Sequence, residues 1–420
     1  MENNNEILKN SNSENSSFFE QKVSSSNGLE GYPNLRFKEF QTEWIDATLN
    51  SITLLIKDGT HGSYNDVKVG IPLLSAKDIE SGKILIPQDC RRISIEDYNS
   101  IFKNYNLKIN DILLTIVGTI GRVAMVDNLT NKYALQRSVA IIRVNSLNHP
   151  LFIFYLLQTN NIKKQYYSKM NQSAQGGIYL DSLNKLSFKN TILSEQEKIA
   201  KFLSIVDKRI EKQRQLVESL KKYKRGLLSA IFERKIRFKD DNGNDYPAWK
   251  EHRIKDIFTV TRGYVLAISE LRDEKDDIYK YPVYSSQTKR EGLMGYYSKP
   301  LYKNAITWTT DGANAGYVKY RNGEFYCTNV CGVLLNDSGY ANAYIAEKLN
   351  SVTKKHVSYV GNPKLMNNVM SEILIEFPSI QEQRKLSKII DKIDFMIKNE
   401  ERYRKDLENY KIGLLQQMFI

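Results

Sequence analysis

A helical segment that occurs twice in this chain constrains its fold more than any other feature. The first copy begins at Glu195 and the second at Glu382, and both open with the pattern Glu-Gln-x-Lys. Aligned without a gap, the two copies also place Asp207 with Asp394. The repeat is too long for a solenoid unit and fits a domain plus its spacer. The sequence therefore predicts a globular domain, a helix, a second globular domain and a second helix.

Both helical copies carry a stripe of mostly apolar residues that alternates steps of four and three, as in a coiled-coil seam. We expect the two helices to pack on each other, because an isolated rod would leave this stripe in water. The seam positions are Ile199, Leu203, Val206, Ile210, Gln213 and Leu220 in the first copy, and Leu386, Ile390, Ile393, Ile397, Glu400, Arg404 and Leu407 in the second.

Seam charges favour an antiparallel pair of helices. A parallel, in-register pair would set Lys224 beside Lys411. Antiparallel packing separates these lysines and brings Gln213, Glu400 and Arg404 together near the middle. The parallel arrangement stays open, because long lysine side chains can reach water.

Short β-branched runs bounded by Gly, Asp and Asn predict strands in both globular regions, among them two separate strands at 316–320 and 325–327. One helix is predicted near residues 151–170 and another near 341–352. The predicted fold class is α+β: two similar globular domains of mixed α/β content, separated by two long helices packed as an antiparallel coiled coil. The predicted boundaries are a disordered, Asn/Ser/Glu-rich tail at 1–31, a first domain at 32–192, a first helix at 193–236, a second domain at 237–378 and a second helix at 379–420.

The net charge of +13 favours a polyanionic partner, with nucleic acid as the first candidate. Three cysteines are too few for a disulfide framework in 420 residues, which indicates a reducing compartment. No apolar run is long enough for a membrane span, and the first residues lack the features of a signal peptide. We therefore expect a cytoplasmic protein without a membrane partner.

Recognisable catalytic and metal-binding patterns are absent from the sequence. It contains no Walker A, G-x-G-x-x-G or H-E-x-x-H pattern, and its four histidines are scattered. The Gly118-Thr119-Ile120-Gly121 segment is either a tight turn or a backbone clamp, with the turn favoured. We expect no catalytic residue and no metal ligand. Two rival functions stay open: a self-contained site-specific nuclease using acids such as Asp78, Glu80, Asp111 and Asp311, and a coiled-coil scaffold without a DNA role.

Loops between the predicted strands carry the residue types that contact phosphates and base edges. Four such loops fall in each globular region, in matching positions of the repeat. The candidate DNA-binding residues are Lys57, Thr60, His61, Ser63, Thr119, Arg122, Gln136, Arg137, Ser138 and Gln175 in the first region, and Arg262, Tyr264, Ser286, Gln287, Thr288, Lys289, Arg290, Asn314 and Lys364 in the second.

Taken in order, several motifs resemble the specificity (S) subunit of type I restriction-modification enzymes. They lie at residues 70–74, 111–122, 136–140 and 193–199, and the resemblance covers about residues 32–420. The Glu-Gln-x-Lys helix starts are its most specific part. The second domain fits more loosely, with Trp308-Thr309-Thr310-Asp311-Gly312 where the first has residues 115–118.

This resemblance implies a non-catalytic subunit in which two target recognition domains each read one half of a split site in double-stranded DNA. The helices would run antiparallel, set the gap between the half-sites and dock two methyltransferase (M) subunits. Restriction (R) subunits would complete the complex. S-adenosylmethionine, ATP and Mg²⁺ would belong to those partners, and this chain would carry no cofactor.

Overall fold

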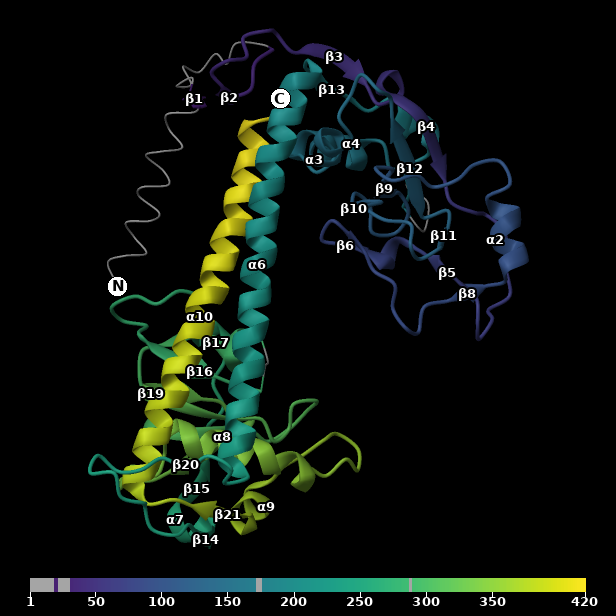
Figure 1. Ribbon diagram of the computed structural model, residues 1–420. Coiled ribbons are helices and arrows are strands. Elements are labelled where there is room, and N and C mark those ends of the chain that lie inside the picture. Colours follow the sequence, from purple (N-terminus) through teal and green to yellow (C-terminus); the bar gives the residue numbers. More distant parts are fainter. Residues whose placement is uncertain (1–18, 22–30, 171–175, 287–288) are drawn as a thin grey trace. The chain divides into compact units, whose positions relative to one another are not determined.

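The computed structural model describes residues 19–21, 31–170, 176–286 and 289–420, which divide into two compact units (Figure 1). Unit 1 contains the described residues up to Gln213 together with Tyr403–Ile420. Unit 2 contains Arg214–Arg402. Each long helix therefore contributes one segment to each unit.

Unit 1 is built on two small sheets and a pair of flanking strands. One sheet has the order β10-β9-β12-β4 and is antiparallel throughout, whereas in the order β11-β5-β8 the strand β11 runs parallel to β5. The bounds are β4 (Thr53–Asp58), β5 (Ile71–Leu74), β8 (Arg92–Ile93), β9 (Ile112–Thr115), β10 (Val123–Met125), β11 (Ala134–Leu135) and β12 (Val139–Val144). Three further antiparallel pairs are β1 (Phe19–Gln21) with β2 (Leu35–Phe37), β3 (Ile45–Thr48) with β13 (Ser187–Asn190), and β6 (Ile79–Glu80) with β7 (Lys83–Ile84).

Strand β1 lies within the region that we expected to be disordered. At Phe19–Gln21 the backbone pairs with β2, which satisfies peptide groups that a disordered tail would leave to water. The rest of the predicted tail, up to residue 30, falls outside the described residues.

Two helices replace the single helix that we predicted at residues 151–170. Helix α3 (Pro150–Leu156) ends before Thr159, and α4 (Asn160–Ser168) begins after it. Thr159 has an extended backbone, and its side chain accepts a hydrogen bond from the Ile162 amide. This N-cap geometry ends one helix and starts the next. The smaller helices of unit 1 are η1 (Asn50–Ile52), η2 (Ala76–Asp78), α2 (Ile95–Ile101) and α5 (Leu180–Asn184).

Unit 2 repeats the strand pairing of unit 1 in one six-stranded sheet, β15-β20-β18-β19-β16-β17. Pair by pair, β15, β20, β18, β16 and β17 take the places of β4, β12, β9, β5 and β8. The bounds are β14 (Lys250–Arg253), β15 (Thr259–Arg262), β16 (Tyr281–Tyr284), β17 (Leu293–Tyr297), β18 (Tyr302–Thr309), β19 (Val318–Cys327), β20 (Cys331–Leu335) and β21 (Leu374–Phe377). The helices are α7 (Ile254–Ile257), η3 (Ile268–Glu270), η4 (Lys289–Gly292), α8 (Ala343–Thr353), η5 (Lys354–His356) and α9 (Asn367–Glu372).

Strand β19 also corrects a prediction, because we expected two strands at 316–320 and 325–327. The chain instead stays in one strand that pairs with β18 through a register shift and then runs parallel to β16. It therefore does the work of both β10 and β11 of unit 1.

The two long helices are α6 (Leu193–Phe232) and α10 (Ile380–Gln417). In unit 1, Asp207 of α6 lies 2.7 Å from Lys411 of α10, and Arg209 bonds to Tyr403. In unit 2, Lys224 of α6 lies 2.6 Å from Asp394, and Lys221 lies 2.8 Å from Glu401. Later residues of one helix meet earlier residues of the other in both units, which confirms the antiparallel pairing.

The C-terminal end of each long helix completes the core of a globular part. In unit 1, Phe419, which follows the end of α10, packs on Trp44 and Phe152 with ring centroids 6.3 and 5.1 Å apart. In unit 2, Phe232 of α6 packs on Tyr344, which also contacts Trp249. The repeat places Phe232 and Phe419 at equivalent positions. In each unit, this aromatic ring lies at or just after the C-terminal end of a long helix whose first residues belong to the other unit.

Buried side chains explain the Glu-Gln start of each long helix. Arg36 donates to both carboxylate oxygens of Glu195, at 2.7 and 2.8 Å, and Arg237 donates to both of Glu382, at 3.3 and 3.0 Å. The segment Arg-Phe-Lys occurs at residues 36–38 and again at 237–239. Its arginine thus ties the start of each domain to the first turn of a long helix.

The glutamine of each pair fixes a second helix. Gln196 accepts a hydrogen bond from the His149 amide at the start of α3. Gln383 accepts one from Asn342, the N-cap of α8. Both glutamine side chains are fully buried, so they need these partners.

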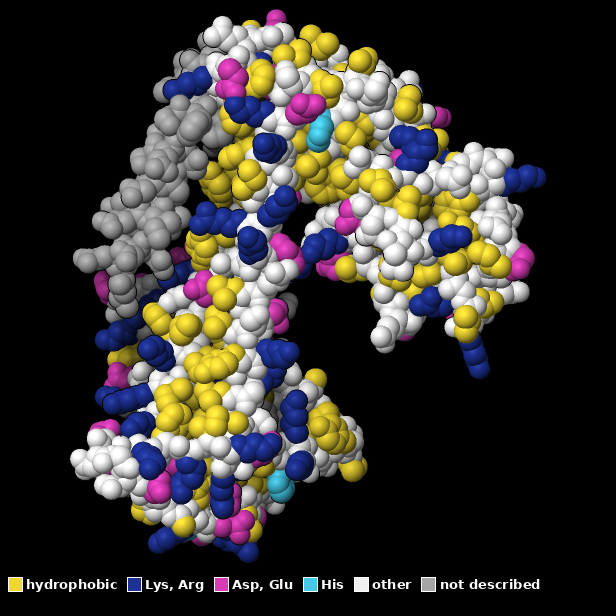
Figure 2. Space-filling view, viewed as in Figure 1, with side chains coloured by type: hydrophobic (Ala, Val, Ile, Leu, Met, Phe, Trp, Pro, Cys, Tyr) yellow, Lys and Arg dark blue, Asp and Glu magenta, His cyan; other side chains and the backbone are white. Residues whose placement is uncertain are grey.

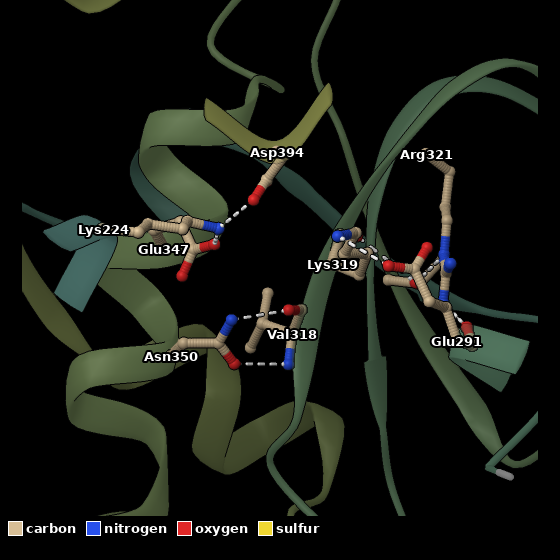
Figure 3. A network of polar contacts seen from close by, with 9 residues as sticks. Lys224, Glu291, Val318, Lys319, Arg321, Glu347, Asn350 and Asp394 are labelled. Carbon is tan, nitrogen blue, oxygen red and sulfur yellow. Dashed lines mark hydrogen bonds and ion pairs between the residues drawn. The ribbon is translucent and has the colours of Figure 1, made fainter. Parts of the chain in front are cut away.

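A polar network joins the two long helices of unit 2 to its sheet (Figure 3). Lys224 of α6 contacts Asp394 of α10 and Glu347 of α8, both at 2.6 Å. On the next turn of α8, the Asn350 side chain bonds to both backbone groups of Val318 in β19, at 2.7 Å each. The helix pair is therefore fixed to the domain by directional contacts as well as by apolar packing.

Candidate nucleic-acid interface

In unit 1, a glycine brings two predicted DNA-binding loops into backbone contact. The amide of Gly59 donates to Val139 O at 3.0 Å, and that of Thr60 donates to Leu135 O at 2.7 Å. A Cβ on Gly59 would overlap the carbonyl oxygens of Leu135 and Gln136, so only glycine permits this approach. Residues 58–64 and 135–139 therefore form one rigid pair of loops.

The same construction recurs in unit 2. The amide of Gly263 donates to Cys331 O at 2.9 Å, and that of Tyr264 donates to Cys327 O at 3.1 Å. A Cβ on Gly263 would overlap the carbonyl oxygens of Cys327 and Thr328.

A second pair of loops is also shared between the units. In unit 1, the Gly118 amide donates to Gly176 O, and the Ile178 amide donates to Ile116 O. In unit 2, the Gly312 amide donates to Pro363 O, and that of Leu365 donates to Thr310 O. The Gly118–Gly121 segment closes the hairpin between β9 and β10 through a hydrogen bond from the Gly121 amide to Thr115 O. It is therefore the tight turn that we favoured, and it also supports a neighbouring loop.

The two units share this backbone frame but differ in the side chains that it presents. Position by position, Thr60 corresponds to Tyr264, Arg137 to Asn329 and Gly177 to Lys364. A repeated backbone frame that carries different side chains is suited to reading two different chemical patterns. Lys and Arg side chains also recur along the faces that Figure 2 shows, with Asp and Glu among them.

A cavity of about 600 Å³ opens beside the first pair of loops in unit 1. Its polar lining includes Asp58, His61, Arg137 and Asp181, and its apolar lining includes Ile116 and Ile178. His61 Nε2 lies 2.5 Å from Asp58 Oδ2. The cavity therefore brings two predicted DNA-binding residues, His61 and Arg137, to one site together with two carboxylates.

Some predicted DNA-binding residues of unit 1 also support the loops. Thr60 bonds to the Tyr64 hydroxyl at 2.7 Å, and Ser138 accepts from the Ala76 amide at 3.1 Å. Arg122 donates to Ile79 O. Lys57 lies over the Tyr105 ring, and burial followed by the charge of Asp58 raises the pKa of Tyr105 to about 12. His61, Ser63, Thr119 and Arg137 are exposed, Gln136 is half-buried, and Gln175 lies outside the described residues.

In unit 2, four of the predicted residues are exposed: Arg262, Tyr264, Arg290 and Lys364. Arg262 donates to Asn329 O at 3.1 Å, and Lys364 lies 3.8 Å from Asp311. Ser286 and Asn314 are half-buried. Gln287 and Thr288 lie outside the described residues, as does the side chain of Lys289.

Sequence reasoning missed one loop of unit 2, residues 328–330. It matches 136–138 of unit 1, because the Thr328 amide donates to Tyr284 O as the Gln136 amide donates to Leu74 O. Its segment, Thr-Asn-Val, carries no charge and gives little signal. The loop at 285–290 instead follows β16 and matches the start of η2 after β5.

Three of the four acids considered for a nuclease, Asp78, Asp111 and Asp311, have other partners. Asp78 caps η2 by accepting from the Ser75 amide, and Asp111 accepts two hydrogen bonds from Arg143, both at 2.8 Å. Asp311 accepts from the Thr310 hydroxyl. Within the described residues, no three His, Cys, Asp or Glu side chains gather so as to hold a metal ion.

All predicted seam residues are buried or half-buried. Arg404 forms its ion pair with Glu408 of its own helix, at 2.6 Å. None of the helices in the described part of the chain is long and apolar enough to cross a membrane.

Comparison with known protein families identifies the family to which this chain belongs. The family model for the type I restriction modification DNA specificity domain matches twice, at residues 63–222 and 247–409. The chain belongs to this family. Its resemblance to S subunits, seen first in the motif order, is therefore confirmed, and the chain is a specificity subunit of a type I restriction-modification system.

Individual relatives agree with this membership. A Mycoplasma pneumoniae protein named as the N-terminus of a type I specificity subunit is 39% identical over 145 residues, which cover 34% of this chain and 76% of the relative. A Methanocaldococcus jannaschii protein named as a type I restriction enzyme specificity subunit is 24% identical and spans 91% of this chain and 94% of its own length. The crystal structure of an S subunit from M. genitalium has the same fold, with a TM-score of 0.61, 19% identity and coverage of 93% of this chain and 99% of that one.

Proposed function

We propose that the two globular domains, at 32–192 and 237–378, each read one half of a split DNA site and that the chain itself is not catalytic. The observation that supports this proposal is the backbone hydrogen-bond pattern that recurs in both units. On this pattern, Arg137 and Thr60 of one unit are replaced by Asn329 and Tyr264 of the other. Identical frames place the readers alike on the duplex, while different side chains select different bases.

Mapping methylated adenines in cells that express the chain with its methyltransferase partner tests this proposal. We expect one motif made of two unlike half-sites separated by a fixed, unspecified gap. A motif without a gap would contradict the split reading. The proposed partners, two M subunits and then R subunits, would carry S-adenosylmethionine, ATP and Mg²⁺.

The long helices are proposed to set the gap. Their seam ion pairs, Asp207 with Lys411 and Lys224 with Asp394, fix the register within each unit. One heptad inserted in each helix, after Gln213 in α6 and before Tyr403 in α10, keeps both pairs and lengthens the rod by about 10 Å. We expect a gap longer by about three base pairs with both half-sites unchanged. Changed half-site sequences would refute this role.

Exposed aromatic residues at equivalent helix positions support docking of two M subunits. Tyr223 and Tyr410 are related by the repeat and are 59% and 42% exposed. Tyrosine is favoured at interfaces, because its ring buries apolar area while its hydroxyl stays bonded. Native mass spectrometry of the co-expressed complex should give two M subunits per chain, and one after either Tyr223→Ala or Tyr410→Ala. Two bound subunits in both variants would place the docking surface elsewhere.

Two simple assays separate the rival functions. A steep loss of DNA affinity with rising salt is expected for a protein that neutralises phosphates, whereas a pure scaffold would show no such slope. Cleavage of DNA by the purified chain with Mg²⁺ alone would support a self-contained nuclease.

A further inference from the structure

The unit 1 cavity combines hydrogen-bond donors and acceptors in a way that suits a base edge better than a phosphate. Arg137 supplies donors, and Asp58 and Asp181 supply carboxylate acceptors. A phosphate group offers only acceptor oxygens and negative charge, so two carboxylates would repel it. The major-groove edge of a base pair presents acceptors and amino donors side by side.

Arg137 is anchored at its backbone and free at its tip. Its amide donates to Thr60 O at 3.0 Å, inside the pair of loops that Gly59 permits. Its guanidinium forms no hydrogen bond or ion pair with any residue that the structure describes, and the side chain is exposed. A fixed backbone together with an unpaired guanidinium group is the arrangement needed for a bidentate contact.

Within the described residues, only one of the two carboxylate oxygens of Asp58 has a hydrogen-bond partner. Its Oδ2 lies 2.5 Å from His61 Nε2, which fixes the orientation of the carboxylate. Its Oδ1 has no hydrogen-bond partner among the described residues. One acceptor oxygen therefore stays available toward the cavity.

We propose that this cavity reads one G·C pair, with Arg137 donating to guanine N7 and O6 and Asp58 accepting from the cytosine N4 amino group. These are the geometric matches of a guanidinium fork and a carboxylate on the major-groove edge. The inference rests on the proposed function and adds the identity of one base pair in the half-site of unit 1. In unit 2, Asn329 takes the place of Arg137, and Arg262 donates to the Asn329 carbonyl, so the assignment applies to unit 1 alone.

The test compares methylation motifs of the full chain, co-expressed with its methyltransferase partner, before and after single substitutions. Arg137→Ala should make one G·C position of one half-site degenerate, with discrimination there falling roughly 5- to 150-fold. The other half-site and the gap should not change. Arg137→Lys keeps the charge but loses the fork, so it should relax the same position. Asp58→Asn should relax that same pair.

The controls separate failure of this inference from failure of the proposed function. Lys164 of α4 is exposed, and Lys164→Ala removes the same charge from unit 1, so it should leave the motif intact. The G·C assignment is wrong if Arg137→Ala leaves the motif intact, whether or not overall methylation drops. It is also wrong if Arg137→Ala relaxes an A·T position. In both cases the proposal that each domain reads one half-site still holds. If the unaltered chain yields no two-part motif, the proposed function itself fails.

Discussion

Lys224 on one long helix lies 2.6 Å from Asp394 on the other, and the repeat places Lys411 and Asp207 in the same relationship at 2.7 Å. The seam lysines that argued against a parallel pair are therefore each matched with the aspartate of the opposite repeat. A charge that would oppose one orientation stabilises the other, which gives the helix pair both direction and register.

Replacing Lys224 with methionine should destabilise unit 2 by about 1–3 kcal/mol, because the half-buried carboxylates of Glu347 and Asp394 would lose their shared partner. Chemical denaturation measures this change. The neighbouring Lys222 is exposed, so Lys222→Met serves as the matched control and should change stability by less than about 0.5 kcal/mol. Equal effects of the two substitutions would show that the seam ion pair is not stabilising.

Arg36→Met should cost more stability than Arg237→Met. The first leaves Glu195 fully buried without its bidentate partner, a loss of about 3–5 kcal/mol. The Arg237 side chain is 32% exposed, against 9% for Arg36, so water can replace part of its contact. Each glutamate keeps one other hydrogen bond, Glu195 from Thr191 and Glu382 from Trp249. We expect about 1–3 kcal/mol for Arg237→Met. Thermal and denaturant unfolding of both variants would decide the order, and a larger loss for Arg237→Met would contradict it.

Acidification should destabilise unit 1 through His149. Burial lowers the pKa of His149 below its ordinary value of about 6.5, and the negative charge of Glu197 partly opposes this shift. A depressed folded pKa means that the contribution is present above about pH 6.5 and is lost as the pH falls. His149→Phe should flatten the pH dependence of unfolding between pH 7 and 5, whereas His356→Phe, at an exposed position, should not. An unchanged slope in His149→Phe would refute this.

Gly59→Ala and Gly263→Ala should each weaken recognition of one half-site only. A Cβ at either position would overlap carbonyl oxygens of the facing loop, and relieving this overlap costs about 1–3 kcal/mol of local distortion. Binding of the full chain to duplexes with one half-site scrambled would reveal which half is lost. Gly226, inside α6 with open space around it, is the control, and Gly226→Ala should instead stabilise by about 0.5–1 kcal/mol. Loss of both half-sites from one glycine substitution would contradict independent reading.

The long helices were predictable because a sustained heptad pattern and repeated start signals are local properties of sequence. Predicted spans of 193–236 and 379–420 compare with Leu193–Phe232 and Ile380–Gln417. The break at Thr159 was missed because the apolar pattern continues across it, and only the cap geometry reveals it. The single strand β19 was missed because a glycine such as Gly323 is typical of the end of a strand. In this structure the strand continues through Gly323.

Part of the candidate interface could be predicted from residue types, and part could not. His61 and Arg137 are polar, exposed residues, and a search for residue types that contact DNA finds both of them. Asn329 and the loop around it are visible only through backbone hydrogen bonds that match those of unit 1. The roles of Gly59 and Gly263 depend on contacts with residues far along the chain, which sequence spacing does not show.

Phe419 closes the core around Trp44. This contact has a consequence for folding during synthesis, because the ribosome adds Phe419 long after Trp44. A ribosome completes residues 31–213 long before it adds 414–419, so Trp44 and Phe152 stay without their closing ring while unit 2, whose residues end at 402, is already made. Nascent unit 1 is therefore expected to wait for the last turns of α10, and products truncated within those turns would present an open apolar core to chaperones and proteases.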